Sequence, residues 1–342
     1  MVDKLIRIIA DDAKKIINKN DFSELSEKTI VITGASGLIG TYFLECLKQI
    51  KEDLRLVAVI QSEPVHYLEH ILDDKRIRIL RGDLTSHSFL NEIPQAEYII
   101  HTAGYAQPGR FMEDQIKTLK LNTEVQLSLF EKLSTDGKYL FVSSSEVYSG
   151  SPNVPYKETD IGITNTTHPR SCYIEGKRCG EAVCNAYRAK GVDAKSARLS
   201  LAYGPGTKRG DKRVMNSFIQ KALEGKITLL DQGRAKRTYC YVSDAVEIMW
   251  KILLHGKEAI YNVGGNSRIT IRELAQKIGS CMKVPVEFPK EAHEAEGAPE
   301  DVYLDMTKVI NEFGKTEYVP FDEGLARTIE WQKALYSSKE GI

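Results

Sequence analysis

The segment 29–40 constrains the fold of this chain more than any other part of its sequence. Residues 29–33 are apolar or β-branched and predict a short strand, which Gly34-Ala35-Ser36-Gly37-Leu38-Ile39-Gly40 and a helical pattern follow directly. Glycines at this spacing permit a tight turn, a close approach of the backbone to a pyrophosphate, and close packing of the helix on the strand. The free N–H groups and positive dipole end of the helix then face the phosphates. The segment predicts a dinucleotide site, with a glycine-rich turn that binds nothing as the alternative. The residues predicted to contact the dinucleotide are Gly34, Gly37, Leu38, Ile39 and Gly40.

Short apolar runs that alternate with helical patterns continue beyond the glycine loop. Helical periodicity is clear at 41–49 and 116–133. Strands that are apolar throughout and alternate with helices predict a parallel sheet covered on both faces. The expected fold class is therefore α/β, with a doubly wound parallel sheet (Rossmann) and a smaller α/β substrate lobe. The further predicted strands are 56–60, 77–80, 98–102, 138–143 and 192–199.

The same patterns divide the chain into three parts. Residues 1–27 predict an amphipathic helix that packs on the main body or on a partner subunit. Residues 28–200 plus about 233–261 form the predicted NAD-binding Rossmann domain. The pattern loosens after Leu201, so about 201–232 plus 262–342 form the predicted substrate-binding lobe. The apolar face of the first helix consists of Ile6, Ile9, Ala10, Ala13, Ile16 and Ile17.

The composition argues against several classes of protein. The 47 Lys and Arg residues balance the 47 Asp and Glu residues, whereas nucleic-acid binding needs a basic surface. Since no stretch approaches about 20 apolar residues and no basic head precedes an apolar run, we expect no membrane span, no signal peptide and a cytoplasmic location. The six cysteines and seven histidines lack metal-ligand spacing, so we expect reduced thiols and no metal site.

Two strand ends bear on how the cofactor is bound. The second strand ends in Gln61-Ser62, where an acid that bonds the adenosine ribose normally stands. The residues therefore leave the choice between NAD and NADP open. After the third strand, Asp83 is placed to reach the adenine edge or, alternatively, to cap a helix.

Tyr173 and Lys177 are the candidate catalytic pair, one helical turn apart on one face. They follow Ser144, at the strand end where doubly wound sheets bind ligands. Loss of hydride from an alcohol carbon also requires a base, and free tyrosine has a pKa of about 10. A positive charge about 6 Å away, at an effective dielectric of about 20, contributes about 3 kcal/mol, or about two pKa units. We predict that Lys177 and an oxidised nicotinamide lower the pKa of Tyr173, which acts as the base while Ser144 orients the substrate hydroxyl.

At these residues the sequence resembles the extended short-chain dehydrogenase/reductase family, in its NAD-dependent epimerase/dehydratase branch, from Thr29 to about Trp331. The resemblance implies a bound NAD, a nucleotide-sugar substrate and a homodimer packed through a four-helix bundle. It also implies cofactor contacts from Asp83, Leu84, Ala103, Asn122, Tyr173 and Lys177. The motifs that carry it are the Thr33 to Gly40 loop, Gly82-Asp83-Leu84, His101-Thr102-Ala103, Asn122, Ser144-Ser145-Glu146-Val147-Tyr148, Tyr173 with Lys177, and Tyr203-Gly204-Pro205.

Within this branch, residues 169–178, 213–218 and 237–244 resemble the UDP-glucuronate decarboxylases most. That resemblance implies that Ser144 and Glu146 act at the sugar and that Arg237 binds the substrate carboxylate or diphosphate. A salt bridge from Glu146 to Arg170 or Arg178 is the alternative. The charge run 208–213 predicts a solvated loop, in which Arg213 is the residue expected to face a phosphate.

The expected function is thus NAD-dependent oxidation at C4 of a nucleotide sugar, as in decarboxylation of UDP-glucuronate. The alternatives are a 4-epimerase, a dehydratase or a ketoreductase, and a non-catalytic dinucleotide-binding protein on the same fold. Two positions depart from the resemblance. Leu201 stands where an Asn usually contacts the diphosphate, and Val302-Tyr303-Leu304-Asp305 stands where an Arg is usual. These departures indicate a different sugar or a different nucleotide base.

Overall fold

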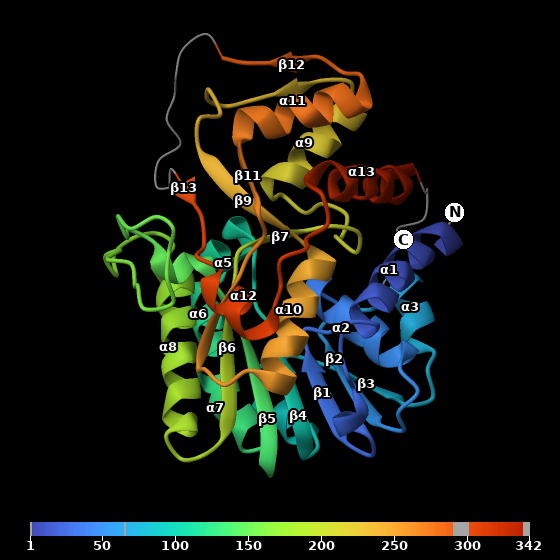
Figure 1. Ribbon diagram of the computed structural model, residues 1–342, viewed down its shortest axis with the longest axis vertical. Coiled ribbons are helices and arrows are strands. Elements are labelled where there is room, and N and C mark those ends of the chain that lie inside the picture. The colour runs from blue at the N-terminus through green and yellow to red at the C-terminus, as the bar shows by residue number, and fades with distance from the viewer. Residues whose placement is uncertain (1, 65, 290–300, 338–342) are drawn as a thin grey trace.

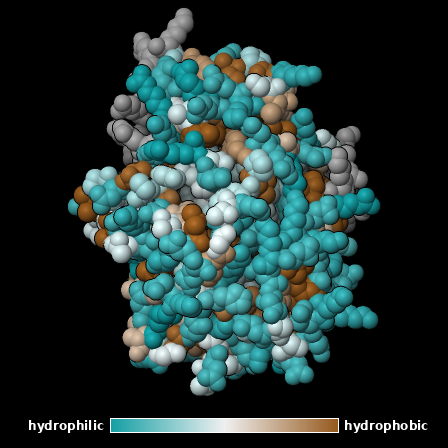
Figure 2. All heavy atoms as spheres, in the orientation of Figure 1, coloured by the Kyte–Doolittle hydropathy of each residue, from teal (hydrophilic) through white to brown (hydrophobic). Residues whose placement is uncertain are grey.

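The computed structural model describes residues 2–64, 66–289 and 301–337, which Figure 1 shows as a larger lobe beneath a smaller one. The predicted substrate lobe includes 290–300 and 338–342, which lie outside the described residues. On the face shown in Figure 2 the surface is mainly hydrophilic, with hydrophobic residues in small separate groups. Among the described helices, none is long and apolar enough to cross a bilayer.

In the described residues, the sheet of the larger lobe contains seven parallel strands in the order β10-β6-β5-β4-β1-β2-β3. This order confirms the predicted doubly wound α/β fold. The reversal between β1 and β4 places a crevice at the carboxyl ends of the strands, where such sheets bind ligands. The sequence did not predict β10. The strands are β1 (Thr29–Thr33), β2 (Arg55–Ile60), β3 (Ile77–Arg81), β4 (Ala96–His101), β5 (Leu133–Ser144), β6 (Asp193–Leu199) and β10 (Ile260–Val263).

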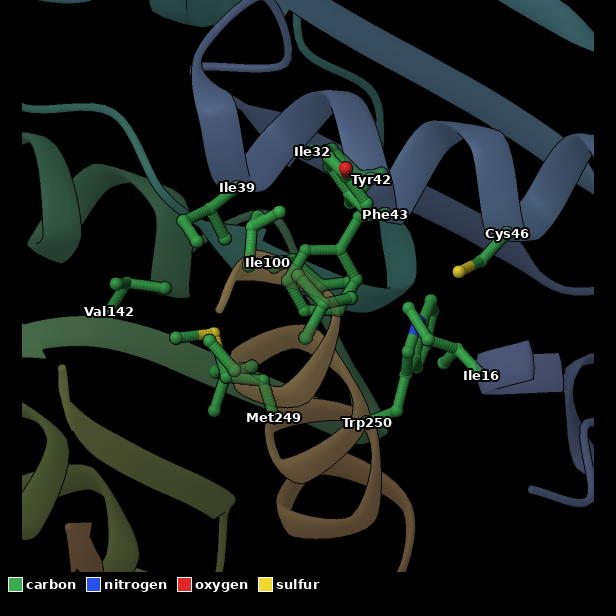
Figure 3. Close-up of a cluster of buried hydrophobic side chains, with 14 of the residues drawn as sticks. Ile16, Ile32, Ile39, Tyr42, Phe43, Cys46, Ile100, Val142, Met249 and Trp250 are labelled. Carbon is green, nitrogen blue, oxygen red and sulfur yellow. The ribbon is translucent and has the colours of Figure 1, made fainter. Parts of the chain in front are cut away.

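Successive residues of each strand pack into two different cores because side chains alternate across a sheet. Ile30 and Ile32 of β1 join the core beneath α1, α2, α3 and α10, whereas Val31 joins the core beneath α4, α6, α7 and α8. Figure 3 shows the first core, where Trp250 lies edge-on to Phe43 with ring centroids 4.8 Å apart. These helices are α1 (Val2–Ile17), α2 (Leu38–Gln49), α3 (His66–Leu72), α4 (His87–Asn91), α6 (Gln115–Asn122), α7 (Glu124–Phe130), α8 (Ser171–Arg188) and α10 (Val242–His255).

The N-terminal helix α1 packs on the main body. Ile9, Ala13 and Ile16 of its predicted apolar face are buried, and so is Leu5. The other three predicted residues, Ile6, Ala10 and Ile17, are partly buried. Its Asp12 is also fully buried. The carboxylate of Asp12 accepts hydrogen bonds from Tyr241 at 2.7 Å, Tyr42 at 3.3 Å and Arg327 at 2.5 Å. Since Arg327 lies on α13 (Phe321–Ser337), one buried carboxylate connects both ends of the described chain.

The helix predicted at 116–133 is broken in the structure. Thr123, between α6 and α7, has φ −128° and ψ −79°, which is not helical. Leu133 already belongs to β5, where it pairs with Ala96. The prediction extended too far because the apolar residues of a helix and of the following buried strand form one continuous pattern.

A second sheet forms the smaller lobe, with β9 (Lys236–Tyr241) at its centre. β9 pairs antiparallel with β11 and parallel with β7 and β13. The predicted boundary near 233 placed this strand in the Rossmann domain, whereas its pairing places it in the smaller lobe. We therefore propose that the lobe includes β9 and that the Rossmann domain resumes at α10. The other elements here are β7 (Leu201–Tyr203), β8 (Ile227–Thr228), β11 (Ser267–Thr270), β12 (Val286–Glu287), β13 (Asp301–Val302), α9 (Val214–Leu223) and α11 (Ile271–Met282).

Candidate active site

A cavity of about 610 Å³ lies where the carboxyl ends of the parallel strands meet the smaller lobe. Its wall includes the glycine loop, the ends of β2, β4 and β5, and residues 199–202 and 206–208. Gly40, Asn122 and Arg237 are the predicted site residues that do not line it. Those that do are Gly34, Gly37, Leu38, Ile39, Asp83, Leu84, Ala103, Ser144, Glu146, Tyr173, Lys177 and Arg213.

The glycine loop has the geometry that a pyrophosphate site needs. Gly34 has a φ of +68°, and a Cβ on it would lie 2.7 Å from the Cα of Ala103. Gly37 precedes α2 with no side-chain cap, so the first N–H groups of this helix lack a capping side chain. A Cβ on Gly40 would lie 2.5 Å from the backbone oxygen of Gly34. Gly40 therefore serves the packing of helix on strand and does not line the cavity.

Asp83 does not cap a helix, because the N-cap of α4 is Ser86. It lines the cavity, and its carboxylate accepts hydrogen bonds from the backbone N–H and the hydroxyl of Thr85 at 2.9 and 2.8 Å. Lys117 donates to the same carboxylate at 2.6 Å. Although burial raises the pKa of Asp83, Lys117 and Thr85 hold it below its usual value. Gln61 and Ser62 line the cavity at the end of β2, where an acid that bonds the adenosine ribose normally stands.

Helix α8 brings Tyr173 and Lys177 together as predicted from their spacing. The Nζ atom of Lys177 lies 5.7 Å from the ring centroid of Tyr173 and donates to the carbonyl oxygen of Val142 at 2.8 Å. The ring of Tyr173 stacks on Phe111 with centroids 4.5 Å apart and an interplanar angle of 9°. Ser144, at the end of β5, is a hydrogen-bonding partner of the Tyr173 phenol.

Burial acts on the pKa of Tyr173 against the effect expected from a neighbouring positive charge. Burial raises the pKa of Tyr173 to about 12, and the hydrogen bond from Ser144 only partly opposes this effect. Burial also lowers the pKa of Lys177 to about 7, with Glu181 opposing. The sequence-based reasoning considered only the attraction between the two groups and neglected the cost of burying either charge. Lowering the pKa of the phenol therefore needs a further positive charge beside it, such as an oxidised nicotinamide.

Glu146 forms the salt bridge that the sequence left as an alternative, and its partner is Arg170. The Nη2 atom of Arg170 donates to Oε1 of Glu146 at 2.5 Å. Arg178 instead donates to the carbonyl oxygens of Val147 and Gly162, at 2.8 Å each. Arg170 also lines the cavity, and within the described chain its buried Nε atom has no hydrogen-bond partner.

Arg170 is a site residue that the sequence analysis missed as a candidate. Its guanidinium carbon lies 5.8 Å from the ring centroid of Phe111, which stacks on Tyr173. Its position in the sequence could have identified it. Arg170 stands three residues before Tyr173, within residues 169–178, which resemble the UDP-glucuronate decarboxylases.

The other predicted arginines occupy different places. Arg213 lines the cavity, and Asp211 accepts from its Nη2 and Nε atoms at 2.6 and 3.0 Å. Arg237 is half-buried outside the cavity wall, and electrostatic interactions with Glu146 and Arg170 place it near that pair.

Asn122 lies beneath α8 and not in the cavity wall. Its Nδ2 atom donates to the carbonyl oxygen of Thr118 at 2.7 Å, and a Cβ on Gly176 would lie 3.4 Å from its own Cβ. It is fully buried, and its Oδ1 atom has no hydrogen-bond partner among residues 2–64, 66–289 and 301–337. Asn122 thus contacts the helix that carries Tyr173 and Lys177.

The phosphate side of the cavity differs from the sequence-based interpretation. Leu201 lines it, in the place of the usual Asn. Lys208 also lines it, although the charge run 208–213 predicted a solvated loop. Its Nζ atom lies 3.4 Å from the hydroxyl of Ser36 in the glycine loop. A cation from the smaller lobe therefore reaches the loop that faces the cofactor site.

The NAD dependent epimerase/dehydratase family matches residues 30–264. UDP-glucuronic acid decarboxylase 1 of Danio rerio is 31% identical over 315 residues, which cover 90% of this chain and 73% of that protein. UDP-glucuronic acid decarboxylase 6 of Arabidopsis thaliana is 31% identical over 305 residues, which cover 88% of this chain and 87% of that protein.

Solved structures share the fold at lower identity. Epimerase Mth375 of Methanothermobacter thermautotrophicus superposes with a TM-score of 0.81 at 20% identity, covering 94% of this chain and 96% of that one. DesIV of Streptomyces venezuelae, a dTDP-glucose 4,6-dehydratase solved as a double mutant with NAD bound, gives 0.77 at 23% identity, covering 89% and 96%. Both support the doubly wound fold described above.

Proposed function

The chain belongs to the NAD-dependent epimerase/dehydratase family, and from this membership we propose that it is an NAD-dependent enzyme that decarboxylates UDP-glucuronate. The relatives named above are UDP-glucuronic acid decarboxylases. The observation that carries the proposal is the charge beside Tyr173. There, Arg170 is paired with Glu146, and a second guanidinium, Arg237, interacts electrostatically with both. A substrate carboxylate would balance this excess of positive charge, whereas a neutral hexose would not.

The residues of the cavity fit NAD. The glycine loop and the first N–H groups of α2 would hold its pyrophosphate, as in other sheets of this type. Lys208 supplies a cation on the opposite wall, 3.4 Å from Ser36. Tyr173 and Lys177 would face the nicotinamide half, beyond the ends of β4 and β5. NAD, when bound, supplies a hydride acceptor and a positive charge that lowers the pKa of a neighbouring phenol.

In the first half of the reaction, Tyr173 accepts the proton of the C4 hydroxyl, which Ser144 holds in position. Lys177 stabilises the resulting phenolate across the 5.7 Å that separate its Nζ atom from the ring centroid. Oxidation at C4 makes the substrate a β-keto acid, because its carboxylate is attached to C5. Arg170, which lines the cavity, orients that carboxylate, and the nearby Arg237 adds positive charge.

Loss of carbon dioxide then leaves an enolate, which the C4 oxygen stabilises. Tyr173 and Ser144 are placed to bind this oxygen, and the positive charges at the site favour the negative charge that develops on it. Protonation at C5 and return of the hydride to C4 give a nucleotide-linked pentose. The reaction has no net redox change and takes up one proton.

We also propose that the protein is a homodimer that packs through α6, α7 and α8. Exposed apolar side chains on this helical layer support the proposal. Ile116 of α6 is 68% exposed and Leu127 of α7 is 46% exposed.

Incubation with UDP-glucuronate, followed by NMR of the anomeric protons, tests the proposed reaction. We expect a UDP-pentose signal together with release of carbon dioxide. Unchanged UDP-glucuronate, with conversion of a neutral nucleotide hexose, would contradict the proposal and favour an epimerase, dehydratase or ketoreductase. Bound NAD without turnover of any nucleotide sugar would favour a non-catalytic protein on this fold.

Substitution of Gly34 by alanine is expected to abolish tight binding of NAD. The added Cβ would lie 2.7 Å from backbone atoms of Ala103, at a φ of +68° that alanine rarely adopts. Calorimetric titration with NAD measures the affinity, which we expect to fall by about tenfold or more. Gly109→Ala is the matched control because nothing lies within 4 Å of a Cβ there. Wild-type affinity in a folded Gly34→Ala variant would contradict the assignment of this loop.

A further inference from the structure

The Lys177 ammonium lies in an environment that disfavours its charge. Lys177 is 5% exposed, and its Nζ atom donates a hydrogen bond to the carbonyl oxygen of Val142. Phe141 presents its ring at 4.7 Å from Nζ. Burial lowers the pKa of Lys177 to about 7 even though Glu181 opposes the shift, so the charged form depends on any group that favours it. The function proposed for Lys177 requires the charged form.

A carboxylate one turn further along α8 opposes this loss of charge. Glu181 is four residues after Lys177, so both side chains lie on the same face of the helix. Glu181 is 4% exposed, and it is the charged group that raises the pKa of Lys177. A buried carboxylate is retained in a fold only where other groups bind it.

Glu181 is held by two such groups. Ser143, the neighbour of Ser144 on β5, donates its hydroxyl to Oε1 at 2.6 Å. Arg198 on β6 donates from Nε to Oε1 at 3.0 Å and from Nη2 to Oε2 at 2.8 Å. This bidentate pair fixes the carboxylate between β5, β6 and α8. Although burial opposes the charge of Arg198, Glu181 raises the pKa of Arg198 above its usual value.

The remaining nitrogen of the Arg198 guanidinium, Nη1, connects this ion pair to the segment that carries Glu146. This atom donates to the hydroxyl of Tyr148 at 2.8 Å and to the carbonyl oxygens of Glu158 and Asp160 at 3.0 and 3.1 Å. Tyr148 in turn donates to Oδ1 of Asn262 at 2.6 Å. Tyr148 ends the short 3-10 helix Ser145–Tyr148 that also carries Glu146. One buried ion pair thus fixes the segments that present Ser144, Glu146 and Lys177.

We propose that Glu181, clamped by Arg198 and Ser143 one helical turn from Lys177, is a positioning residue that favours the charged form of the Lys177 amine beside Tyr173. The proposal rests on the function proposed above for Lys177. Stability alone is a weak reason for such a pair, because well-packed apolar residues often replace a buried ion pair without loss. A fixed negative charge next to a buried lysine is a function that apolar residues could not supply.

Other charged or titratable groups near Lys177 do not supply this charge. On α8, Tyr173 is neutral while its pKa is near 12. On β4, His101 is buried between the Thr33 hydroxyl and the Leu121 carbonyl, and burial lowers its pKa to about 3. On β5, the contacts are the Val142 carbonyl and the Phe141 ring. On β6, Arg198 is turned to Glu181.

The pH dependence of acetylation of Lys177 by acetic anhydride tests the proposal, because only the neutral amine reacts. Mass spectrometry of the peptide that contains Lys177 gives the rate, with every variant brought to the same cofactor content. In Glu181→Gln we expect the midpoint of the curve of acetylation rate against pH to move to lower pH. At a pH of about 6.5 the rate should rise about threefold or more. Glu175→Gln, on the same helix and paired with Arg178, should keep the wild-type midpoint.

A second variant covers the case in which Glu181→Gln does not fold. Glu181→Met with Arg198→Met removes the whole pair and leaves no unpaired buried charge. It should also move the midpoint to lower pH, since Glu181 is the charge that acts on Lys177. A wild-type midpoint in either folded variant would overturn the proposal. The labelling requires no substrate, so a failure here is distinct from a failure to decarboxylate UDP-glucuronate.

Discussion

Substitution of Tyr173 by phenylalanine is expected to lower turnover by about a hundredfold or more, with little change in substrate affinity. The variant loses only the phenolic oxygen, because its ring can still stack on Phe111, whose centroid is 4.5 Å away. Without that oxygen the C4 hydroxyl of the substrate loses its base. Lys177 is a poor replacement, since its Nζ atom is bound to the Val142 carbonyl at 2.8 Å.

Single-turnover measurement of the transient reduction of bound NAD gives the rate, and calorimetric titration with UDP-glucuronate gives the affinity. Tyr187→Phe is the matched control on the same helix. The ring of Tyr187 stacks on Phe130 at 4.0 Å, within the core and outside the cavity wall, so this variant should keep nearly the wild-type rate. A Tyr173→Phe variant that stays within a few fold of the wild-type rate would show that another group is the base.

The glycine loop and the larger sheet could be predicted because their signals are local. Residues 29–40 contain the strand, the turn and the start of the helix in one continuous segment, and the structure has them as predicted. The break at Thr123 could not be predicted in the same way. The helical periodicity of the apolar residues continues through the break, and tertiary packing decides where the helix ends.

The smaller lobe was harder to predict because its sheet is built from distant segments. β9 pairs with residues 201–203, 267–270 and 301–302, so no local pattern shows which sheet it joins. Lys208 was missed for a similar reason. A run of charged residues usually faces solvent, and only the packing of the lobe on the glycine loop brings Lys208 to Ser36.

The pKa of Tyr173 shows a further limit of sequence reasoning. Spacing on a helix places two side chains on one face, and the Nζ atom of Lys177 indeed lies 5.7 Å from the ring centroid of Tyr173. Burial depends on every element that packs around the pair, and here it outweighs the attraction of the lysine. The sign of a pKa shift therefore could not be obtained from the spacing alone.

Arg170→Met is expected to raise the KM for UDP-glucuronate by about tenfold to a hundredfold. A hydrogen bond to a charged group contributes about 1.5–3 kcal/mol, which corresponds to this range. The substitution also releases Glu146 from the 2.5 Å hydrogen bond that neutralises it. The substrate carboxylate would then meet an uncompensated negative charge as well as a missing partner. Methionine fills a similar volume against Phe111, so the stack beneath Tyr173 should persist.

The neutral analogue UDP-glucose separates recognition of the carboxylate from general damage to the site. Its binding to Arg170→Met, measured by titration, should stay close to that of the wild type, because it has no carboxylate to lose a partner. Arg237→Met provides a comparison from the smaller lobe, where the guanidinium is half-buried and interacts with the same pair. If both arginines bind the carboxylate, both variants should discriminate less between the two nucleotides. If Arg170→Met binds UDP-glucuronate as the wild type does, the excess positive charge beside Tyr173 serves another group, and the argument for a uronate substrate loses its main support.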